Sequence, residues 1–96
     1  MTIDEFVVAL QEKFPAEKDW DAVFKVLEGK RYWKIVRHDK CKDLNDGCSV
    51  YAFIDKNNGN LYKPASFRIP AKHVRGNIND ASGLDACEKY SVRYLR

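Results

Sequence analysis

The chain has 96 residues, of which 45% are hydrophobic and 32% are charged, and this composition is typical of one folded domain over residues 1–96. It argues against disorder, and a membrane span is excluded because no segment approaches about 18 consecutive apolar residues. The formal net charge of +3 is unevenly distributed, since residues 1–29 are mainly acidic while residues 30–42 and 61–76 are mainly basic, which argues against a uniformly basic, histone-like coat.

Two helices are predicted in the N-terminal third of the chain. Thr2 and Glu5 have the spacing of a capping box, in which each side chain satisfies a free backbone N–H group at a helix start. The apolar residues that follow recur at steps of three and four, as one helical face requires, and Pro15 ends the pattern: Ile3, Phe6, Val7, Leu10 and Phe14. A second helix is predicted from about residue 17 to a C-cap at Gly29, on a similar stripe of Trp20, Val23, Phe24 and Leu27.

The pattern after Gly29 is that of a sheet. Residues 31–37 and 49–54 are rich in aromatic and β-branched side chains and predict two strands, the second central because it is apolar on both faces. Residues 39–47 are expected to form a loop, residues 55–60 (DKNNGN) a hairpin turn, and residue 61 to begin a returning strand.

The last third of the chain is predicted to hold one short helix and one strand. Pro70 is placed to open a helix over residues 71–74 that Gly76 closes, residues 77–88 look irregular, and residues 90–95 alternate as a last strand. The fold class is therefore α+β, with two N-terminal helices packed on a small antiparallel sheet of three to four strands.

Motifs of catalysis and metal binding are missing from the sequence. It has no GxSxG, Walker, HExxH or dinucleotide-binding motif. His38 lies close to Cys41 and Cys48, but the two-sided ligand spacing of a zinc site is absent, and a disulfide between these two cysteines is the weaker interpretation. Three cysteines without CxxC spacing, together with an acidic N-terminus, fit a protein that stays in a reducing cytoplasm. We expect no enzymatic activity, no metal and no cofactor.

A first basic block covers residues 30–42. Its cations alternate with Tyr32 and Trp33, so that it resembles a nucleic-acid contact strip in which cations neutralise phosphates and rings stack on bases: Lys30, Arg31, Lys34, Arg37, Lys40 and Lys42. A solvated strand face that balances the acidic helices explains the same pattern, and this is the interpretation that we favour for this block.

A second basic segment covers residues 61–76 and contains no acidic residue. Two prolines stiffen it, and a helix beginning at Pro70 would add backbone N–H groups for an anion. The predicted ligand-binding residues are Lys63, Ser66, Arg68, Lys72, His73 and Arg75, with Tyr62 and Phe67 as stacking residues. The alternative is an exposed edge strand that charge keeps soluble.

Four stretches of the sequence resemble small uncharacterised proteins encoded by tailed bacteriophages. They are residues 49–55 (SVYAFID), 59–66 (GNLYKPAS), 70–78 (PAKHVRGNI) and 90–96 (YSVRYLR), all in the C-terminal half. The resemblance implies a viral protein that acts in the cytoplasm of a bacterial host. The family has no assigned activity, so the resemblance implies no functional residues; small early phage proteins are typically binders.

Three functions remain open at this point. The first is a non-enzymatic protein that binds phosphate-bearing ligands, most simply nucleic acid, through the second basic segment. The second is an inhibitor or adaptor of a host protein, which would use a sheet edge or imitate nucleic acid with its acidic residues: Asp4, Glu5, Glu12, Glu17, Asp19, Asp21 and Glu28. The third is sequestration of a nucleotide signal by the same basic segment. The sequence leaves the oligomeric state undecided.

Overall fold

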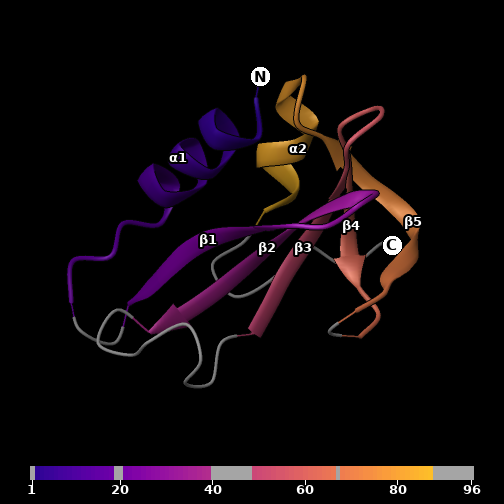
Figure 1. The fold of residues 1–96 in the computed structure, drawn as a ribbon. Helices are drawn as coiled ribbons and strands as arrows, with labels where there is room; N and C mark the ends of the chain where they lie inside the picture. Colours follow the sequence, from indigo (N-terminus) through magenta and orange to yellow (C-terminus); the bar gives the residue numbers. More distant parts are fainter. Residues whose placement is uncertain (1, 19–20, 40–48, 67, 88–96) are drawn as a thin grey trace.

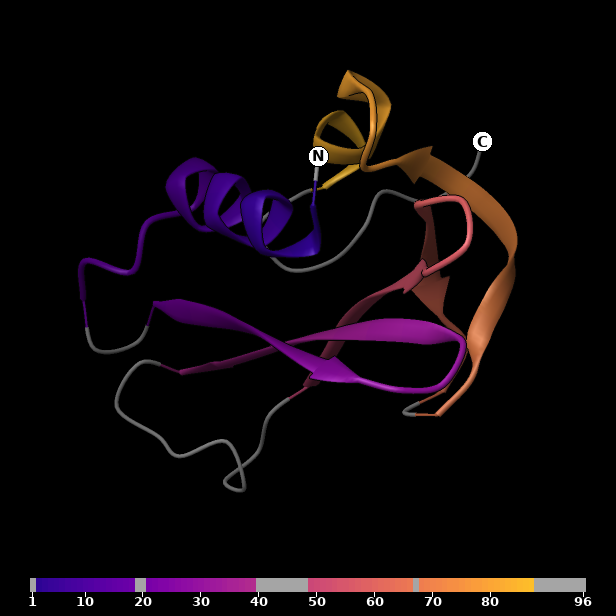
Figure 2. The same ribbon diagram turned by 45° about the horizontal axis from the view of Figure 1, so that its top comes forward.

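The protein is described here from a computed structural model, which defines residues 2–18, 21–39, 49–66 and 68–87. It is an α+β fold in which a helix precedes a five-stranded antiparallel sheet and a short helix follows it. Both helices lie on the same side of the sheet, and β5 curves along its flank (Figures 1 and 2). In the described part of the chain no helix is long and apolar enough to cross a membrane.

The N-terminal helix α1 (Ile3–Lys13) begins as the sequence predicts. The Thr2 hydroxyl accepts a hydrogen bond from the backbone N–H of Glu5 at 3.1 Å, and the Glu5 carboxylate accepts one from the Thr2 N–H at 2.9 Å. Phe6 and Leu10 are buried one turn apart against the sheet, so the predicted helical face is confirmed.

The predicted second helix is wrong. Residues 22–28 instead form β1 (Ala22–Glu28), which pairs along its whole length with β2 (Tyr32–Asp39). The helical stripe also fits a strand here, because Phe24 and Val26 alternate with the exposed Lys25 and Leu27, and β-branched residues favour an extended backbone. Gly29 closes the β1–β2 turn rather than a helix, with its N–H donating to the carbonyl of Tyr32 at 3.0 Å.

The central strand β3 (Ser49–Asp55) supplies more buried hydrophobic residues than any other element of the described structure. A register shift between Ile35 and Val36 leaves Tyr51 without an opposing residue on β2, so that Tyr51 and Ala52 both reach the helix-facing side. The Tyr51 ring packs edge-on against Phe24, with ring centroids 5.0 Å apart. The predicted position of this strand at the centre of the sheet is confirmed.

The sheet continues through β4 (Asn60–Pro64) and β5 (Pro70–Asn77). The predicted hairpin turn at residues 55–60 is confirmed, and Gly59 adopts a φ of 78°, a left-handed conformation that glycine tolerates. The predicted helix over residues 71–74 is wrong: Pro70 is the first residue of a strand, a position where its missing N–H leaves no ladder bond unmade.

A short helix, α2 (Ala81–Ala86), follows β5 in a region that the sequence suggests is irregular. Asp80 caps it by accepting a hydrogen bond from the N–H of Ser82 at 2.8 Å. Lys13 joins the two helices, because its Nζ donates to the carbonyl oxygens of Leu84 and Cys87 at 2.8 and 2.9 Å. The predicted loop at residues 39–47 falls almost wholly outside the described residues, as do Cys41, Cys48 and the predicted strand at 90–95.

Candidate functional site

The second basic segment lies on the β4–β5 hairpin. Lys63 is on β4, Ser66 and Arg68 are at the tip, and Lys72, His73 and Arg75 are on β5. Because no helix begins at Pro70, the predicted anion site at a helix N-terminus is wrong. Phe67 lies outside the described residues.

Ser66 orders the hairpin tip. Its Oγ accepts hydrogen bonds from the N–H groups of Arg68 and Ile69, at 3.3 and 3.2 Å, while the Ile69 carbonyl accepts from Ala65 and Ser66 at 2.9 and 3.1 Å. These four bonds close a compact tip in which the backbone of Arg68 is fixed and its side chain is exposed. Ser66 therefore helps to fix the position of the Arg68 backbone, from which the Arg68 side chain extends.

Arg68 shares a pocket with the first basic block. The pocket has a volume of about 320 Å³ and lies against the β1–β2 turn. We call it the basic pocket, and its described lining is Leu27, Glu28, Gly29, Lys30, Arg31, Tyr32, Lys34, Phe53 and Arg68. Four of these side chains are cations, contributed by two hairpins that are far apart in the sequence.

Aromatic rings line the pocket on the sheet face opposite the helices. Tyr32 packs edge-on against Phe53 and Tyr62, with centroid separations of 5.9 and 6.1 Å. Two cations lie over this cluster: Arg31 Cζ is 5.2 Å from the centroid of Tyr32, and Lys34 Nζ is 5.7 Å from that of Phe53. The basic pocket thus combines an aromatic floor with a cationic rim, and Tyr62 supports Tyr32 without lining the pocket.

Two acidic residues lie beside the basic pocket, and each has a cationic partner. The Glu28 carboxylate lies 2.7 Å from Lys56 Nζ, and this hydrogen bond and charge lower the pKa of Glu28 below its usual value. Asp55 is buried, where it accepts a hydrogen bond from the N–H of Asn57 at 2.8 Å and lies 3.8 Å from Arg31 Nε. Glu28 is the one acid among the described lining residues, and Lys56 offsets its charge.

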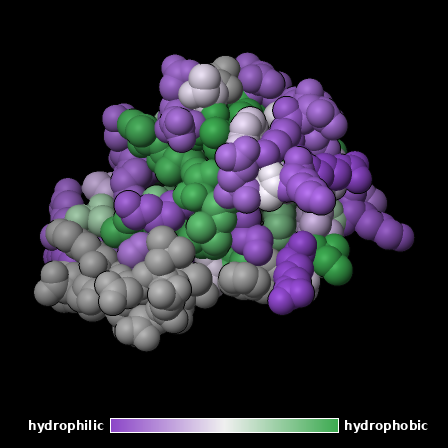
Figure 3. All heavy atoms as spheres, in the orientation of Figure 1, coloured by the Kyte–Doolittle hydropathy of each residue, from purple (hydrophilic) through white to green (hydrophobic). Residues whose placement is uncertain are grey.

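The other predicted residues are not gathered in this pocket. Lys72 and His73 are exposed on β5 and Arg75 is half-buried there, while Lys63 is half-buried on β4. Hydrophilic side chains cover the side of the molecule on which β5 lies (Figure 3). Of the predicted cations in residues 61–76, Arg68 is the one that the described structure places in the basic pocket.

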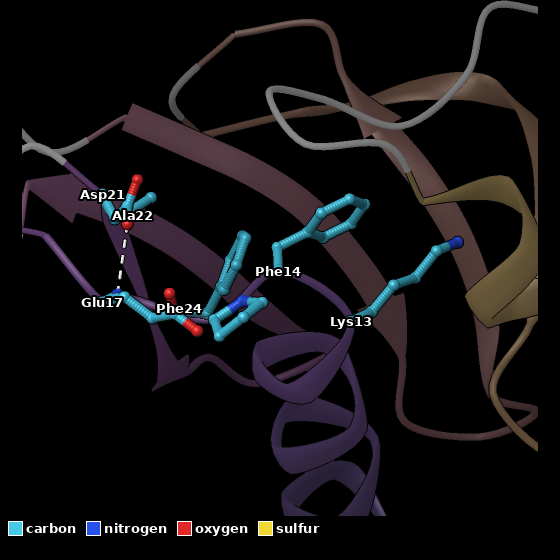
Figure 4. A pocket seen from close by; sticks show the side chains of 7 residues that line it. Lys13, Phe14, Glu17, Asp21, Ala22 and Phe24 are labelled. Atoms are coloured by element: carbon cyan, nitrogen blue, oxygen red, sulfur yellow. Dashed lines mark hydrogen bonds between the residues drawn. The ribbon is translucent and has the colours of Figure 1, made fainter.

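A second pocket, of about 230 Å³, opens between the end of α1 and the start of β1 (Figure 4). The rings of Phe14 and Phe24 form its apolar wall. Two of its polar side chains contact other parts of the structure: Asp21 accepts from the N–H groups of Glu17 and Lys18 at 3.1 and 3.0 Å, and Lys13 points away toward α2.

Metal-ligating side chains are not clustered in the described residues, where no three His, Cys, Asp or Glu side chains lie together. Cys87 is buried under α2, and its Sγ lies 3.3 Å from the carbonyl oxygen of Gly83. Burial raises the pKa of Cys87 to about 11, so its thiol is protonated and a poor nucleophile at neutral pH.

Sequence comparison connects this chain to one protein family. The model of a family of unknown function (DUF7717) matches residues 3–92, nearly the whole chain and therefore more than the C-terminal half on which the resemblance described above rests. No curated protein and no solved structure matches. These comparisons assign no function, so the function has to be inferred from the surface of the protein.

Proposed function

The chain belongs to this family of unknown function, and we propose that it is a non-enzymatic protein that binds phosphate-bearing ligands, most simply nucleic acid, at the basic pocket. One observation carries the proposal: Arg68 of the β4–β5 hairpin lines the same pocket as Lys30, Arg31 and Lys34. One cation of the second basic segment thereby lies in the same pocket as three cations of the first basic block.

The electrostatics of this site favour an anion. Four cations line it, the one acid among its described lining residues, Glu28, is bound to Lys56, and the buried Asp55 lies 3.8 Å from Arg31 Nε. Arginine forks match phosphate oxygens, and cations on a concave rim reinforce one another's field.

The site also supports the proposal that the protein acts without catalysis. The basic pocket holds one carboxylate, which is engaged by Lys56, and its other polar groups are permanent cations and one phenol. We further propose, from the resemblance to phage proteins, that the ligand is met in the cytoplasm of an infected bacterium.

The acidic residues of the first 29 positions support host-protein mimicry less well. They do not share one helical surface, because residues 22–28 form a strand, and Glu5 is used in the helix cap. We therefore place the inhibitor hypothesis second to ligand binding.

A paired charge reversal tests the proposal. Lys30→Glu with Arg68→Glu removes one cation from each hairpin of the basic pocket, and Lys18→Glu with Lys72→Glu changes the net charge equally at positions outside it. Fluorescence anisotropy with a labelled oligonucleotide at about 50 and 200 mM salt measures affinity and its salt dependence. Circular dichroism confirms the fold of each variant.

The pocket variant should weaken binding about tenfold or more and flatten the salt dependence, since each lost phosphate contact removes about 0.9 from the log–log slope on duplex DNA. The control should stay within about threefold, as expected for cations remote from the bound phosphates. A wild-type protein that binds neither DNA nor RNA at low salt overturns the proposal. A control that loses as much as the pocket variant overturns the choice of this pocket as the site.

A further inference from the structure

We propose that the basic pocket receives a nucleotide whose base is unpaired, so that the protein prefers single strands or free nucleotides to duplexes. This inference rests on the proposed function and adds the class of ligand. It follows from the size of the pocket, the rings on its floor and the placement of its cations.

The volume of the pocket suits one nucleotide. About 320 Å³ lies at the small end of the range for pockets that enclose a small molecule. A duplex is far wider, since its major groove alone is about 12 Å across, and would contact the rim without entering. A base that is stacked and paired inside a duplex would have to be flipped out to reach the floor.

The floor of the pocket offers an aromatic surface to such a base. Tyr32 is held by edge contacts to Phe53 and Tyr62, which fix the plane of its ring. Arg31 lies over Tyr32, and single-stranded recognition commonly stacks bases on both aromatic rings and arginine planes. Phe53 is buried whereas Tyr32 is half-buried, so among the described lining residues Tyr32 is the ring that an entering base would meet.

The rim of the pocket supplies cations from two different hairpins. Lys30 and Arg31 belong to the β1–β2 turn, and Arg68 belongs to the ordered tip of the β4–β5 hairpin. A nucleotide in the pocket therefore has cations from two elements within reach of its phosphate. In a single strand, the phosphates that precede and follow the bound base would lie toward these two hairpins.

Competition binding tests this inference. A labelled single-stranded oligonucleotide is displaced by the unlabelled strand, by the duplex of the same sequence, and by a nucleoside monophosphate. We expect the single strand to compete at a concentration about tenfold or more below that of the duplex, because a paired base must be extruded first.

A second measurement places the base on Tyr32. Tyr32→Leu removes the ring from the pocket, whereas Tyr62→Leu removes a ring from the same cluster but outside the pocket lining, and both variants lose the Tyr32–Tyr62 contact. Tyr32→Leu should weaken single-strand binding about fivefold or more, and Tyr62→Leu less than about twofold, as base–aromatic stacking predicts. The fluorescence of a 2-aminopurine base in the strand should be quenched by the wild type and by Tyr62→Leu, and not by Tyr32→Leu.

The outcomes separate this inference from the function on which it rests. Duplex that competes as well as single strand, or equal losses in the two tyrosine variants, overturns the unpaired-base pocket while nucleic-acid binding stands. Absence of binding to every probe overturns both. A monophosphate that displaces the strand at about its own concentration supports the pocket and identifies a free nucleotide as the ligand, whereas a monophosphate that competes far more weakly supports it with a strand as the ligand.

Discussion

The side chain of Gln11 hydrogen-bonds to the backbone of Phe24, in the place that a neighbouring strand would take. Its Oε1 accepts a hydrogen bond from the Phe24 N–H at 3.0 Å, and its Nε2 donates to the carbonyl of Ala22 at 3.1 Å and to that of Phe14 at 2.9 Å. One amide thus satisfies three backbone groups, two on the outer edge of β1 and one at the end of α1. This bridge anchors the helix to the first strand of the sheet.

Replacing Gln11 with Ala should destabilise the protein by about 1–3 kcal/mol, because the half-buried N–H of Phe24 and two carbonyls lose their partner. Urea unfolding followed by circular dichroism measures the change. Glu12→Ala, at the exposed neighbouring position, is the matched control and should change stability by less than about 0.5 kcal/mol. Alanine favours a helix more than glutamine or glutamate does, so helix propensity predicts no loss in either variant, and equal losses would contradict the role of the bridge.

Gly76 and Gly83 let α2 approach β5 closely. A Cβ on Gly76 would lie 2.7 Å from the carbonyl carbon of Ser82, and one on Gly83 would lie 2.5 Å from the carbonyl oxygen of Asn77. Each Gly→Ala change should destabilise the protein by about 1–3 kcal/mol through overpacking against backbone.

The double variant of Gly76 and Gly83 distinguishes this contact from two independent effects. Once one methyl group has displaced α2, the second should add less, so the loss in the double variant should be smaller than the sum of the single losses. Thermal unfolding of the four proteins measures this difference. Strict additivity would show that the two glycines do not share one contact.

Burial of Cys87 predicts a loss of stability in alkali. Its pKa is raised to about 11 in the folded protein, so between the usual thiol value near 9 and pH 11 the unfolded chain loses this proton while the folded chain keeps it. Stability from this group is complete below about pH 9 and falls as pH rises, by up to about 2 kcal/mol near pH 11.

The comparison for Cys87 is a Cys87→Ala variant, since alanine lacks the titrating group. The difference in unfolding free energy between wild type and variant should narrow from pH 8 to pH 10.5. Native Cys87 should also resist iodoacetamide at pH 8 and react after unfolding, as mass spectrometry of its peptide would reveal. A pH-independent difference would contradict the raised pKa.

Glu28 is predicted to weaken anion binding at the basic pocket. Its pKa is lowered by Lys56, so the carboxylate remains charged until the pH falls below its usual value of 4.5. Glu28→Gln removes this negative charge, so that it no longer offsets the charge of Lys56. Oligonucleotide binding should therefore strengthen about threefold to tenfold at low salt. Glu12→Gln is the control for the change in net charge, and equal gains in both variants would contradict a local effect.

Local signals in the sequence predicted several elements correctly. The capping box at Thr2 and Glu5 depends on neighbouring residues, and the turn around Gly59 depends on a glycine with positive φ. The strand at residues 49–55 has the continuous apolar pattern of a central strand. Each of these needs little information from the rest of the fold.

The failures came where partners distant in sequence decide the structure. Residues 22–28 fit a helical stripe of Val23, Phe24 and Leu27, and they also fit a strand in which Phe24 and Val26 alternate with Lys25 and Leu27. Pairing with β2, together with the hydrogen bonds from Gln11, selects the strand. The short α2 was missed because Gly83 disfavours a helix in isolation, yet its lack of a side chain is what lets α2 pack on β5. Asp80 was the available signal, as a residue that commonly caps helices.

The candidate site was half predictable for the same reason. The sequence marks Arg68 as a cation in an acid-free segment, while it favours a solvated face for Lys30, Arg31 and Lys34. Joining them requires knowing that residues 22–28 form a strand and that Gly29 turns the chain back. In that arrangement the β1–β2 turn lies beside the β4–β5 hairpin.

Because two hairpins contribute to the basic pocket, the pocket exists only when the whole sheet is folded. A peptide of residues 61–76 carries the charge of Arg68 and its neighbours but none of the pocket floor, so it should compete poorly for the same ligand. Conversely, a ligand that contacts both hairpins binds the native state alone and raises the melting temperature as its concentration rises. A ligand bound in the basic pocket should therefore slow backbone hydrogen exchange in the β1–β2 and β4–β5 hairpins together.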